Sequence, residues 1–459
     1  MCKGFGCCLL KYTCRQICLF TIGISNGISV GAVFAFSAVL FFQLENDNSF
    51  VLNEKQSHMI EHIPLVLMIP AALFSGTIVE KIGRKATLLL LDVVAFISWL
   101  LVFLGENYGM IIVARCLIGI YVGAFYPTFI TFIGEVTTPK YRSVLLTAIP
   151  LGSTHGFFAC AIAGEFFHWK IVAAIFALCS LYNIAILLHF KESYVTHLDC
   201  NKIETAREAF AWFRGYDDAA KEEFNELLAH KYADPTTSFT QVIRMYTSKA
   251  FLLPLSISIL VFFTVQCTRI LAMQLYTLRI ITTFNNSEVF VCYVVIGINS
   301  LSTIGMIVSM ILIKIFSVRV MLIFSGYIVG ILLLALGGVM YLSLHFIDPI
   351  YQIISIILLV VITLLHWIGL YPLSAVVCGE MFPQTTRTAG ISISAFTSFL
   401  FSFVYLEVVP LLFASIGPYW TLVLFGHCAI IGTVVTHKLL SETKNKTLLD
   451  INNMISMNQ

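Results

Sequence analysis

Two short segments of the chain carry the same arrangement of an acid and an arginine. Gly134-Glu135 is followed by Arg142 seven residues after the acid, and Gly379-Glu380 is followed by Arg387 at the same spacing. Carboxylates and guanidinium groups form charge-assisted hydrogen bonds, so these residues could hold neighbouring segments together. Because the arrangement occurs once in each half of the chain, it also indicates an internal repeat.

A further set of polar residues interrupts an apolar stretch. Gln266, Thr268 and Arg269 follow a long run of hydrophobic residues. A charged side chain inside a membrane-spanning segment is costly and by default marks a functional site, so Arg269 could bind an anionic or strongly polar group. The alternative is an internal ion pair of Arg269 with Glu407 or Asp92, which also lie in apolar stretches.

The composition shows which elements must position these residues. Of the 459 residues, 59% are hydrophobic and only 11% are charged, and the mean hydropathy is +0.91. These values predict an integral membrane protein and exclude a soluble enzyme, a disordered regulator and a nucleic-acid binder. The net charge of +2 gives no bulk attraction to a charged partner.

Apolar stretches long enough to cross a membrane predict an all-α protein with twelve transmembrane helices. The predicted spans are 17–42, 59–79, 86–104, 109–133, 144–164, 169–190, 251–280, 289–313, 320–344, 351–378, 389–411 and 417–437. If the N-terminus is cytosolic, 22 of the 27 Lys and Arg residues lie on the cytosolic side. This excess predicts that both termini are cytoplasmic.

One long polar segment divides the spans into two sets of six. We therefore predict a cytosolic N-tail (1–16), an N-terminal six-helix bundle (17–190), a cytosolic linker (191–250), a C-terminal six-helix bundle (251–440) and a cytosolic C-tail (441–459). Charged and aromatic residues alternate through 201–231, which predicts short amphipathic helices, and the alternative is a solvated linker. Parallel six-helix repeats around a midplane site are typical of major facilitator transporters.

Several motifs occur in a fixed order along nearly the whole chain. They are GTIVEKIGRK at 76–85, Arg115 with Gly119 and Gly123, Glu135 to Arg142, WFRG at 212–215, Gly369 with Pro372 and Leu373, Glu380 to Arg387, and SETKNKTL at 441–448. This ordered set resembles the sugar porter family of the major facilitator superfamily, close to the animal trehalose and glucose carriers. In the first motif Glu80 stands where the family has Asp.

The resemblance implies a cytosolic gate in which acids and arginines pair between the two halves. The residues that it assigns to this gate are Arg84, Lys85, Glu135, Arg142, Glu192, Arg319, Glu380, Arg387 and Glu442. The alternative is that each of them only anchors a helix end at the headgroups. The motif of the second half is eroded, because Lys314 to Arg319 stand where the family has an acid followed by two bases.

The resemblance also implies a central sugar pocket lined by amides and aromatic residues. The matching residues of this chain are Gln266, Thr268, Arg269, Tyr276, Ser302, Ser398 and Phe399, and Gln266 is the single retained amide. The family's amide in span five is replaced by Pro150, and its tryptophan in span ten is replaced by Ala375. Arg269 stands where the family has glycine. The histidines within the predicted spans, including His366, are expected to be neutral packing residues.

These observations lead to one preferred function and two alternatives. We expect a facilitative uniporter of a sugar such as glucose or trehalose, because the first span lacks the acid that proton coupling uses in this family. The alternatives are a carrier of a non-sugar, anionic molecule and a non-transporting sensor. No nucleotide-binding loop, metal motif or catalytic constellation is present, so we expect neither an enzyme nor a cofactor. The expected partners are a small-molecule substrate and membrane lipid but no nucleic acid, and we expect a monomer in the plasma membrane.

Overall fold

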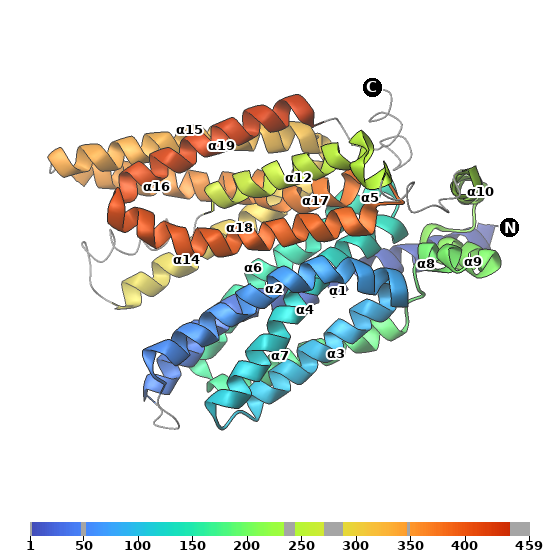
Figure 1. Cartoon of the computed structure of the whole chain (residues 1–459), viewed down its shortest axis with the longest axis horizontal. Coiled ribbons are helices and arrows are strands. Elements are labelled where there is room, and N and C mark those ends of the chain that lie inside the picture. The colour runs from blue at the N-terminus through green and yellow to red at the C-terminus, as the bar shows by residue number, and fades with distance from the viewer. Residues whose placement is uncertain (1, 47–51, 234–243, 270–287, 347–348, 441–459) are drawn as a thin grey trace. The chain divides into compact units, whose positions relative to one another are not determined.

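The computed structural model describes residues 2–46, 52–233, 244–269, 288–346 and 349–440, and within these ranges it is all-helical (Figure 1). The helices of the first half are α1 (Cys2–Asn46), α2 (Glu54–Ile82), α3 (Arg84–Phe103), α4 (Tyr108–Val136), α5 (Pro139–Leu146), α6 (Ala148–Phe166) and α7 (Trp169–Leu188). Three shorter helices follow, namely α8 (Tyr194–Asp199), α9 (Ile203–Arg214) and α10 (Asp218–Ala233).

The second half contains α12 (Lys249–Cys267), α14 (Glu288–Ile315), α15 (Val318–His345), α16 (Pro349–Leu365), α17 (Tyr371–Met381), α18 (Arg387–Ser415) and α19 (Pro418–Leu439). Between α16 and α17 the chain forms one π-helical segment, η1 (His366–Leu370). Helix starts follow local sequence. For example, the side chain of Asn53 caps α2 in a reciprocal capping box with Gln56, and Ser317 caps α15.

The twelve predicted spans correspond to helices of the described chain. Eleven helical stretches are long and apolar enough to cross a membrane within the described ranges, and α14 corresponds to the remaining predicted span. α12, which corresponds to the predicted span over 251–280, ends at Cys267. At this end the hydroxyl of Thr268 donates to the carbonyls of Thr264 and Val265. Residues 270–280 lie outside the described ranges.

The chain divides into two compact units. Of the described residues, those within 1–255 and 378–396 form the first unit, and those within 256–377 and 397–440 form the second. The segment 378–396, which contains the end of α17 and the start of α18, therefore packs with the first half of the sequence. This placement brings Glu380 and Arg387 into the same unit as Glu135 and Arg142.

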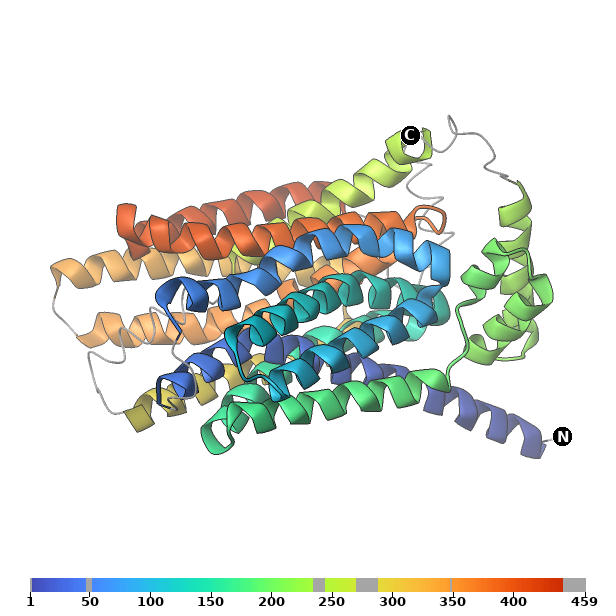
Figure 2. The same ribbon diagram turned by 60° about the horizontal axis from the view of Figure 1, so that its bottom comes forward.

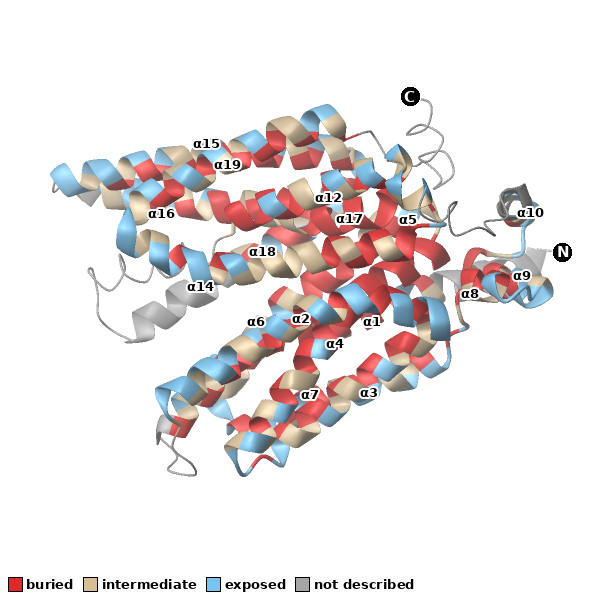
Figure 3. Cartoon of the chain, viewed as in Figure 1, coloured by how far each residue is buried: buried red, intermediate tan, exposed pale blue. Residues whose placement is uncertain are grey.

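Glycines allow the helices of the first unit to pack backbone against backbone. A Cβ atom at Gly31 of α1 would lie 1.9 Å from the carbonyl oxygen of Ser153, and one at Gly156 of α6 would lie 1.9 Å from that of Ile28. No side chain fits in that space, so only glycine permits this approach. α4 lies deep in the unit, since every residue from Tyr121 to Val136 except Tyr126 is buried (Figure 3).

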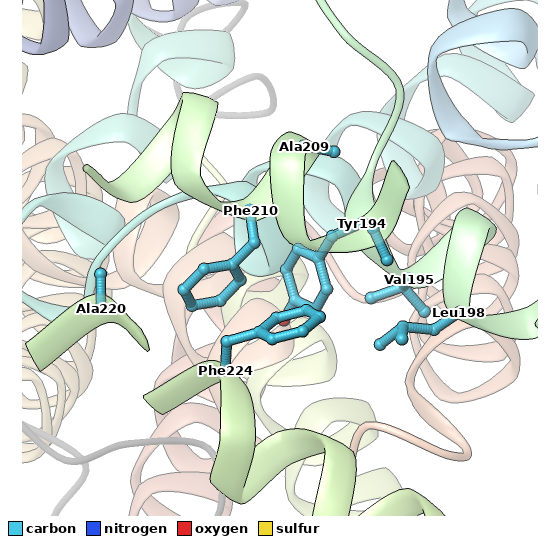
Figure 4. Close-up of a cluster of buried hydrophobic side chains, with 8 residues drawn as sticks. Tyr194, Val195, Leu198, Ala209, Phe210, Ala220 and Phe224 are labelled. Atoms are coloured by element: carbon cyan, nitrogen blue, oxygen red, sulfur yellow. The ribbon is translucent and has the colours of Figure 1, made fainter. Parts of the chain in front are cut away.

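The linker helices α8, α9 and α10 form a small apolar core of their own in the first unit, as the sequence analysis predicted for amphipathic helices. Tyr194, Phe210 and Phe224 meet ring to ring in this core (Figure 4). α9 also contacts α1, where the guanidinium group of Arg15 lies 4.1 Å from the ring centroid of Trp212. Figure 2 shows the three helices, in green, at the end of the first unit from which α1 starts.

In the second unit α15 packs along α19, and η1 lies between α14 and α15. Gly369 of η1 permits this arrangement, because a Cβ atom there would lie 2.1 Å from the hydroxyl of Ser325. A π-helical turn is rare and often marks a functional site, because it re-aims side chains that a regular helix would place elsewhere. In this unit the segment begins with the buried residue His366.

Candidate functional site

The first unit contains a buried cluster of arginines and acids, which we name the charged cluster. Its members are Arg84, Glu135, Arg142, Arg214, Glu380 and Arg387. They come from the start of α3, the end of α4, α5, the end of α9, α17 and the start of α18. Five of them belong to the gate residues implied by the sequence, and the structure brings these five together in one unit.

The carboxylate of Glu135 binds two side chains of the first unit, Arg84 and Ser193. Its Oε1 atom accepts from Nε of Arg84 at 3.1 Å and lies 3.1 Å from Nη2 of the same guanidinium group. Its other carboxylate oxygen accepts from the hydroxyl of Ser193. The exposed fractions of the Arg84 and Glu135 side chains are only 4% and 2%, so this ion pair is desolvated and separating it is expensive.

A second acid of the charged cluster, Glu380, comes from the other half of the sequence. Its Oε1 atom accepts from the hydroxyl of Ser143 at 2.6 Å, and its charge attracts the fully buried guanidinium group of Arg142. Arg387 donates from Nη2 to the carbonyl of Phe382 at 3.2 Å and is attracted by the charge of Glu135. Acids and bases from both repeats therefore interact within the first unit.

The linker helices contribute to this network, which the sequence analysis did not anticipate. Arg214 at the end of α9 donates from Nη2 to the carbonyl of Glu135 at 3.0 Å and forms an ion pair with Glu223 of α10. Burial raises the pKa of the Tyr194 hydroxyl, although the nearby charge of Arg214 opposes this shift. The WFRG motif at 212–215 was the available signal, because it contains Arg214.

The other implied gate residues have different partners or are not described. Glu192 caps the start of α3, since its Oε1 atom accepts from the backbone amides of Arg84 and Lys85, both at 2.9 Å. The ammonium group of Lys85 donates to the carbonyl of Leu188 at the end of α7, and Arg319 donates to the carbonyl of His437 at the end of α19. These contacts correspond to the helix-anchoring alternative. Glu442 lies outside the described ranges.

The second unit contains a cluster of hydrogen-bonded polar side chains around Gln266, which we name the polar cluster. The amide of Gln266 donates to the hydroxyl of Ser402 at 2.7 Å and accepts from Nη1 of Arg269 at 3.3 Å. The hydroxyl of Tyr405 donates to the backbone carbonyl of Arg269 at 2.8 Å. These contacts connect the end of α12 to α18.

His366 extends the polar cluster to η1. Its Nδ1 atom lies 3.1 Å from the hydroxyl of Thr268, and both side chains are buried. The ring of Trp367 follows directly and packs edge-on against Tyr371, with centroids 4.7 Å apart. The polar cluster therefore combines amide, hydroxyl, imidazole and guanidinium groups next to aromatic rings, a combination that suits a polar, hydroxylated ligand.

Only some of the implied pocket residues belong to the polar cluster. Gln266, Thr268 and Arg269 do, and the backbone carbonyl of Ser398 accepts from Ser402. Ser302 is buried on α14, Phe399 is half-buried on α18, and Tyr276 lies outside the described ranges. The sequence analysis missed Ser402 and Tyr405. It expected His366 to be a neutral packing residue, and the structure shows this side chain buried beside the hydroxyl of Thr268. A signal existed for Ser402, which lies one turn after Ser398 on the same helix face.

The structure also bears on the alternative roles of Arg269. Asp92 is fully buried in the first unit, and neither of its carboxylate oxygens has a hydrogen-bond partner among the described residues. Arg269 instead donates to Gln266, and the other candidate acid, Glu407, is exposed on α18. Within the described ranges no group of three or more His, Cys, Asp or Glu side chains is placed to hold a metal ion.

Comparison with known families identifies the class of protein. A family model described as sugar (and other) transporter matches residues 11–455. The chain belongs to the sugar transporter family. As a member of that family it is a multi-pass membrane protein of a transporter family and not an enzyme. Its predicted membership of the sugar porters is thereby confirmed.

Relatives of this family member have low sequence identity over most of its length. It is 24% identical to a protein named facilitated trehalose transporter Tret1 of Anopheles gambiae over 92% of this chain and 54% of the relative. It is also 24% identical to the Tret1 protein of Culex quinquefasciatus over 96% of this chain and 86% of the relative. The chain thus spans about half the length of the Anopheles protein and most of the Culex protein.

Solved structures confirm the major facilitator fold. The proton:xylose symporter XylE bound to 6-bromo-6-deoxy-D-glucose superposes with a TM-score of 0.82 at 16% identity, covering 96% of this chain and 99% of that one. An inward-open structure of XylE from E. coli gives a TM-score of 0.65 at 15% identity, covering 96% and 99%. At such identities the similarity concerns the fold of this sugar transporter family member and not its substrate.

Proposed function

We propose that this protein is a facilitative sugar transporter that equilibrates a sugar such as glucose or trehalose across the plasma membrane by alternating access. The observation that carries the proposal is the polar cluster around Gln266. A sugar that loses its water needs a partner for each hydroxyl group, and the side chains of Gln266, Arg269, Ser402 and His366 can donate or accept. The trehalose carriers named above support this substrate class.

In this proposal the charged cluster is the cytosolic gate. Opening toward the cytosol would separate Glu380 and Arg387 from the residues of α4 and α5 beside them. Because these groups are buried, the separation must be offset by their hydration and by new contacts in the open state. Binding of substrate can then shift the balance between the two states by its differential affinity for them.

Uniport is supported by the hydrogen-bond partners of Arg115, the one arginine of α4, which lies two turns after the start of that helix. Its guanidinium group donates to the backbone carbonyls of Ile60 and Val33, at 3.1 and 3.2 Å, and to the hydroxyl of Ser37. These neutral partners do not exchange protons in the physiological range. The first span contains no acid that could serve as a proton carrier, and the acid whose charge acts on Arg115 is Glu61 of α2.

A second candidate function is transport of an anionic solute, which the guanidinium group of Arg269 favours. A carrier that selects an anion through Arg269 would lose that substrate on Arg269→Gly, whereas a sugar carrier, in which Arg269 is one of several hydrogen-bonding groups, would retain reduced sugar uptake. We further propose that both termini are cytoplasmic, because the loops on that side carry most of the Lys and Arg residues. We also propose that the protein is a monomer surrounded by membrane lipid.

The test is tracer uptake into proteoliposomes that contain the purified protein. Glucose, trehalose and a panel of organic anions are compared with empty vesicles, and Arg269→Gly is measured in parallel. We expect saturable uptake of a sugar. Anion uptake that Arg269→Gly abolishes would replace the sugar proposal with the anion carrier, and no uptake of any solute would contradict both and favour a sensor.

A further inference from the structure

An acid and an amide lie on facing helices of the first unit. α3 and α7 are antiparallel neighbours. Lys85 near the start of α3 donates from Nζ to the carbonyl of Phe190 just after α7, at 2.5 Å, and Trp99 near the end of α3 packs on Phe176 of α7, with ring centroids 5.1 Å apart. These two contacts fix the register of the helix pair.

The register places Asp92 opposite Asn183. Asp92 lies seven residues before Trp99, and Asn183 lies seven residues after Phe176, so each is two helical turns from that contact on the same helix face. The same pairing places Ala95 opposite Ser180. All of these residues are buried, and Asp92 and Asn183 have no exposed surface.

Neither side chain has another partner. Both carboxylate oxygens of Asp92 and both amide atoms of Asn183 lack a hydrogen bond to any described residue. Buried polar groups are nearly always hydrogen bonded, because leaving one unpaired costs about 1–3 kcal/mol. The structure shows no hydrogen bond between Asp92 and Asn183 either, so pairing them requires a change of side-chain rotamer. That pairing is the simplest arrangement that satisfies all four atoms.

Such a pairing requires a proton on Asp92. A neutral carboxyl group presents one donor and one acceptor, and a primary amide presents the complementary acceptor and donor. An ionised carboxylate only accepts, so it would face the amide oxygen of Asn183 with like partial charge.

The charges around Asp92 also favour the neutral acid. Burial dominates its environment, and no charged residue of the described ranges balances a carboxylate there. Tyr121 is the titratable group that faces it from α4, and its hydroxyl donates to Asn26 of α1 at 2.7 Å. Cys179 of α7 lies near Tyr121, and Arg84, eight residues before Asp92 on α3, is paired with Glu135.

We propose that Asp92 and Asn183 form a buried proton-binding site, in which Asp92 keeps its proton at neutral pH and the two side chains exchange two hydrogen bonds. An alkali cation fits the site less well, because it needs several oxygen ligands. The carbonyls of α3 and α7 are engaged in their helices, and the nearby hydroxyl of Ser180 donates to the carbonyl of Phe176. With its proton, Asp92 is uncharged and its hydrogen bonds to Asn183 hold α3 in register with α7. This structural role does not depend on which substrate the protein carries.

Infrared spectroscopy of the full-length protein in lipid nanodiscs tests this site. At neutral pH we expect the carbonyl stretch of a protonated carboxyl group, which is lost in Asp92→Asn and retained in the control Asp218→Asn, whose carboxyl group is exposed on α10. Asn183→Leu should shift the band to higher frequency, because the acid carbonyl loses its donor. Asp92→Asn is isosteric and should keep the thermal midpoint of the parent, since two amides also pair reciprocally.

Two results would overturn the proposal. The first is the absence of a protonated-carboxyl band at neutral pH, or its persistence in Asp92→Asn. The second is a band that depends on the cation, present in a choline buffer and lost on addition of sodium or potassium, which would show that a metal cation occupies the site instead.

Discussion

At the residue scale, Glu135 connects three parts of the first unit. Its carboxylate binds Arg84 of α3 and Ser193 just before α8, and its backbone carbonyl binds Arg214 of α9. The first two of these contacts need a charged acceptor with little access to water. The linker helices are therefore attached to the membrane-spanning helices through the same residue that forms the buried ion pair.

Replacing Glu135 by Gln should destabilise the folded protein strongly. The change removes the nearest counter-ion of the buried Arg84 guanidinium group and leaves Asp199, an exposed acid 3.7 Å away, as its remaining ion-pair partner. Breaking a buried pair costs about 3–5 kcal/mol, and because Asp199 remains we expect a loss toward the lower end of that range. The thermal midpoint of the purified variant in nanodiscs measures the effect. The control is Glu208→Gln, which removes an ion pair with Lys191 whose side chains are 73% and 42% exposed. Equal midpoints for the two variants would contradict the assigned role of Glu135.

Replacing Gln266 by Leu should lower sugar transport while the protein stays folded. The variant removes a donor to Ser402 and an acceptor for Arg269, so we expect kcat/KM to fall about ten- to hundredfold, or ~1.4–2.8 kcal/mol. The control is Ser355→Ala in the same unit, because its buried hydroxyl only donates to the carbonyl of Tyr351 on its own helix. Uptake by Gln266→Leu equal to that of the control would remove the polar cluster from the proposed pocket.

At the scale of the elements, the tightest contact is the one between α1 and α6. Gly27 and Gly31 of α1 lie against Gly152 and Gly156 of α6, and Cβ atoms at these positions would lie within 2.5 Å of backbone oxygen atoms. Helices in a membrane gain little from the hydrophobic effect on association, so such packing is a main source of their stability.

Gly156→Ala should therefore prevent correct packing of α1 on α6. The added methyl group would have to displace the backbone of Ile28, which overpacks the contact and lowers the thermal midpoint. The matched control is Gly338→Ala on α15, where nothing lies within 4 Å of the new atom. That control should be neutral or stabilising by up to about 1 kcal/mol, since alanine favours a helix. A stable Gly156→Ala variant would show that α1 and α6 pack less closely.

The positions of most helices could be predicted from the sequence, but some of their ends could not. Long apolar runs determined which segments are helices, because only a helix satisfies the backbone in lipid. The end of α12 at Cys267 and the π-helical turn at His366 could not be predicted in this way. At these places Thr268 contacts His366 and Gly369 lies against Ser325, and both contacts join residues far apart in the sequence.

The candidate site was predictable to a similar extent. The repeated spacing of Glu135 with Arg142 and of Glu380 with Arg387 indicated ion pairing, and the structure places all four in the charged cluster. Glu192 was assigned the same role from its motif, yet nearby backbone amides at the start of α3 are its partners. A sequence motif identifies a charged residue but cannot show which of several nearby groups will bind it.

At the scale of the whole molecule, the proposed uniport limits how far the protein can concentrate a sugar. A uniporter has no second gradient to draw on, so it should bring a sugar to equal concentrations on both sides and no further. We expect an imposed pH gradient to leave the final sugar concentration in proteoliposomes unchanged, and a preloaded sugar to accelerate entry of the labelled sugar. Accumulation above the external concentration under a pH gradient would show proton coupling and contradict the proposed uniport.

The glycine contact between α1 and α6 has a mechanical consequence. Two helices whose backbones touch at several successive turns cannot slide or rotate against each other without first moving apart, so they behave as a single stiff strut. In any conformational cycle of the protein, α1 and α6 must then move together, and the bending of helices must occur in other elements. Spin labels on the two helices should keep one sharp distance in every state of the cycle.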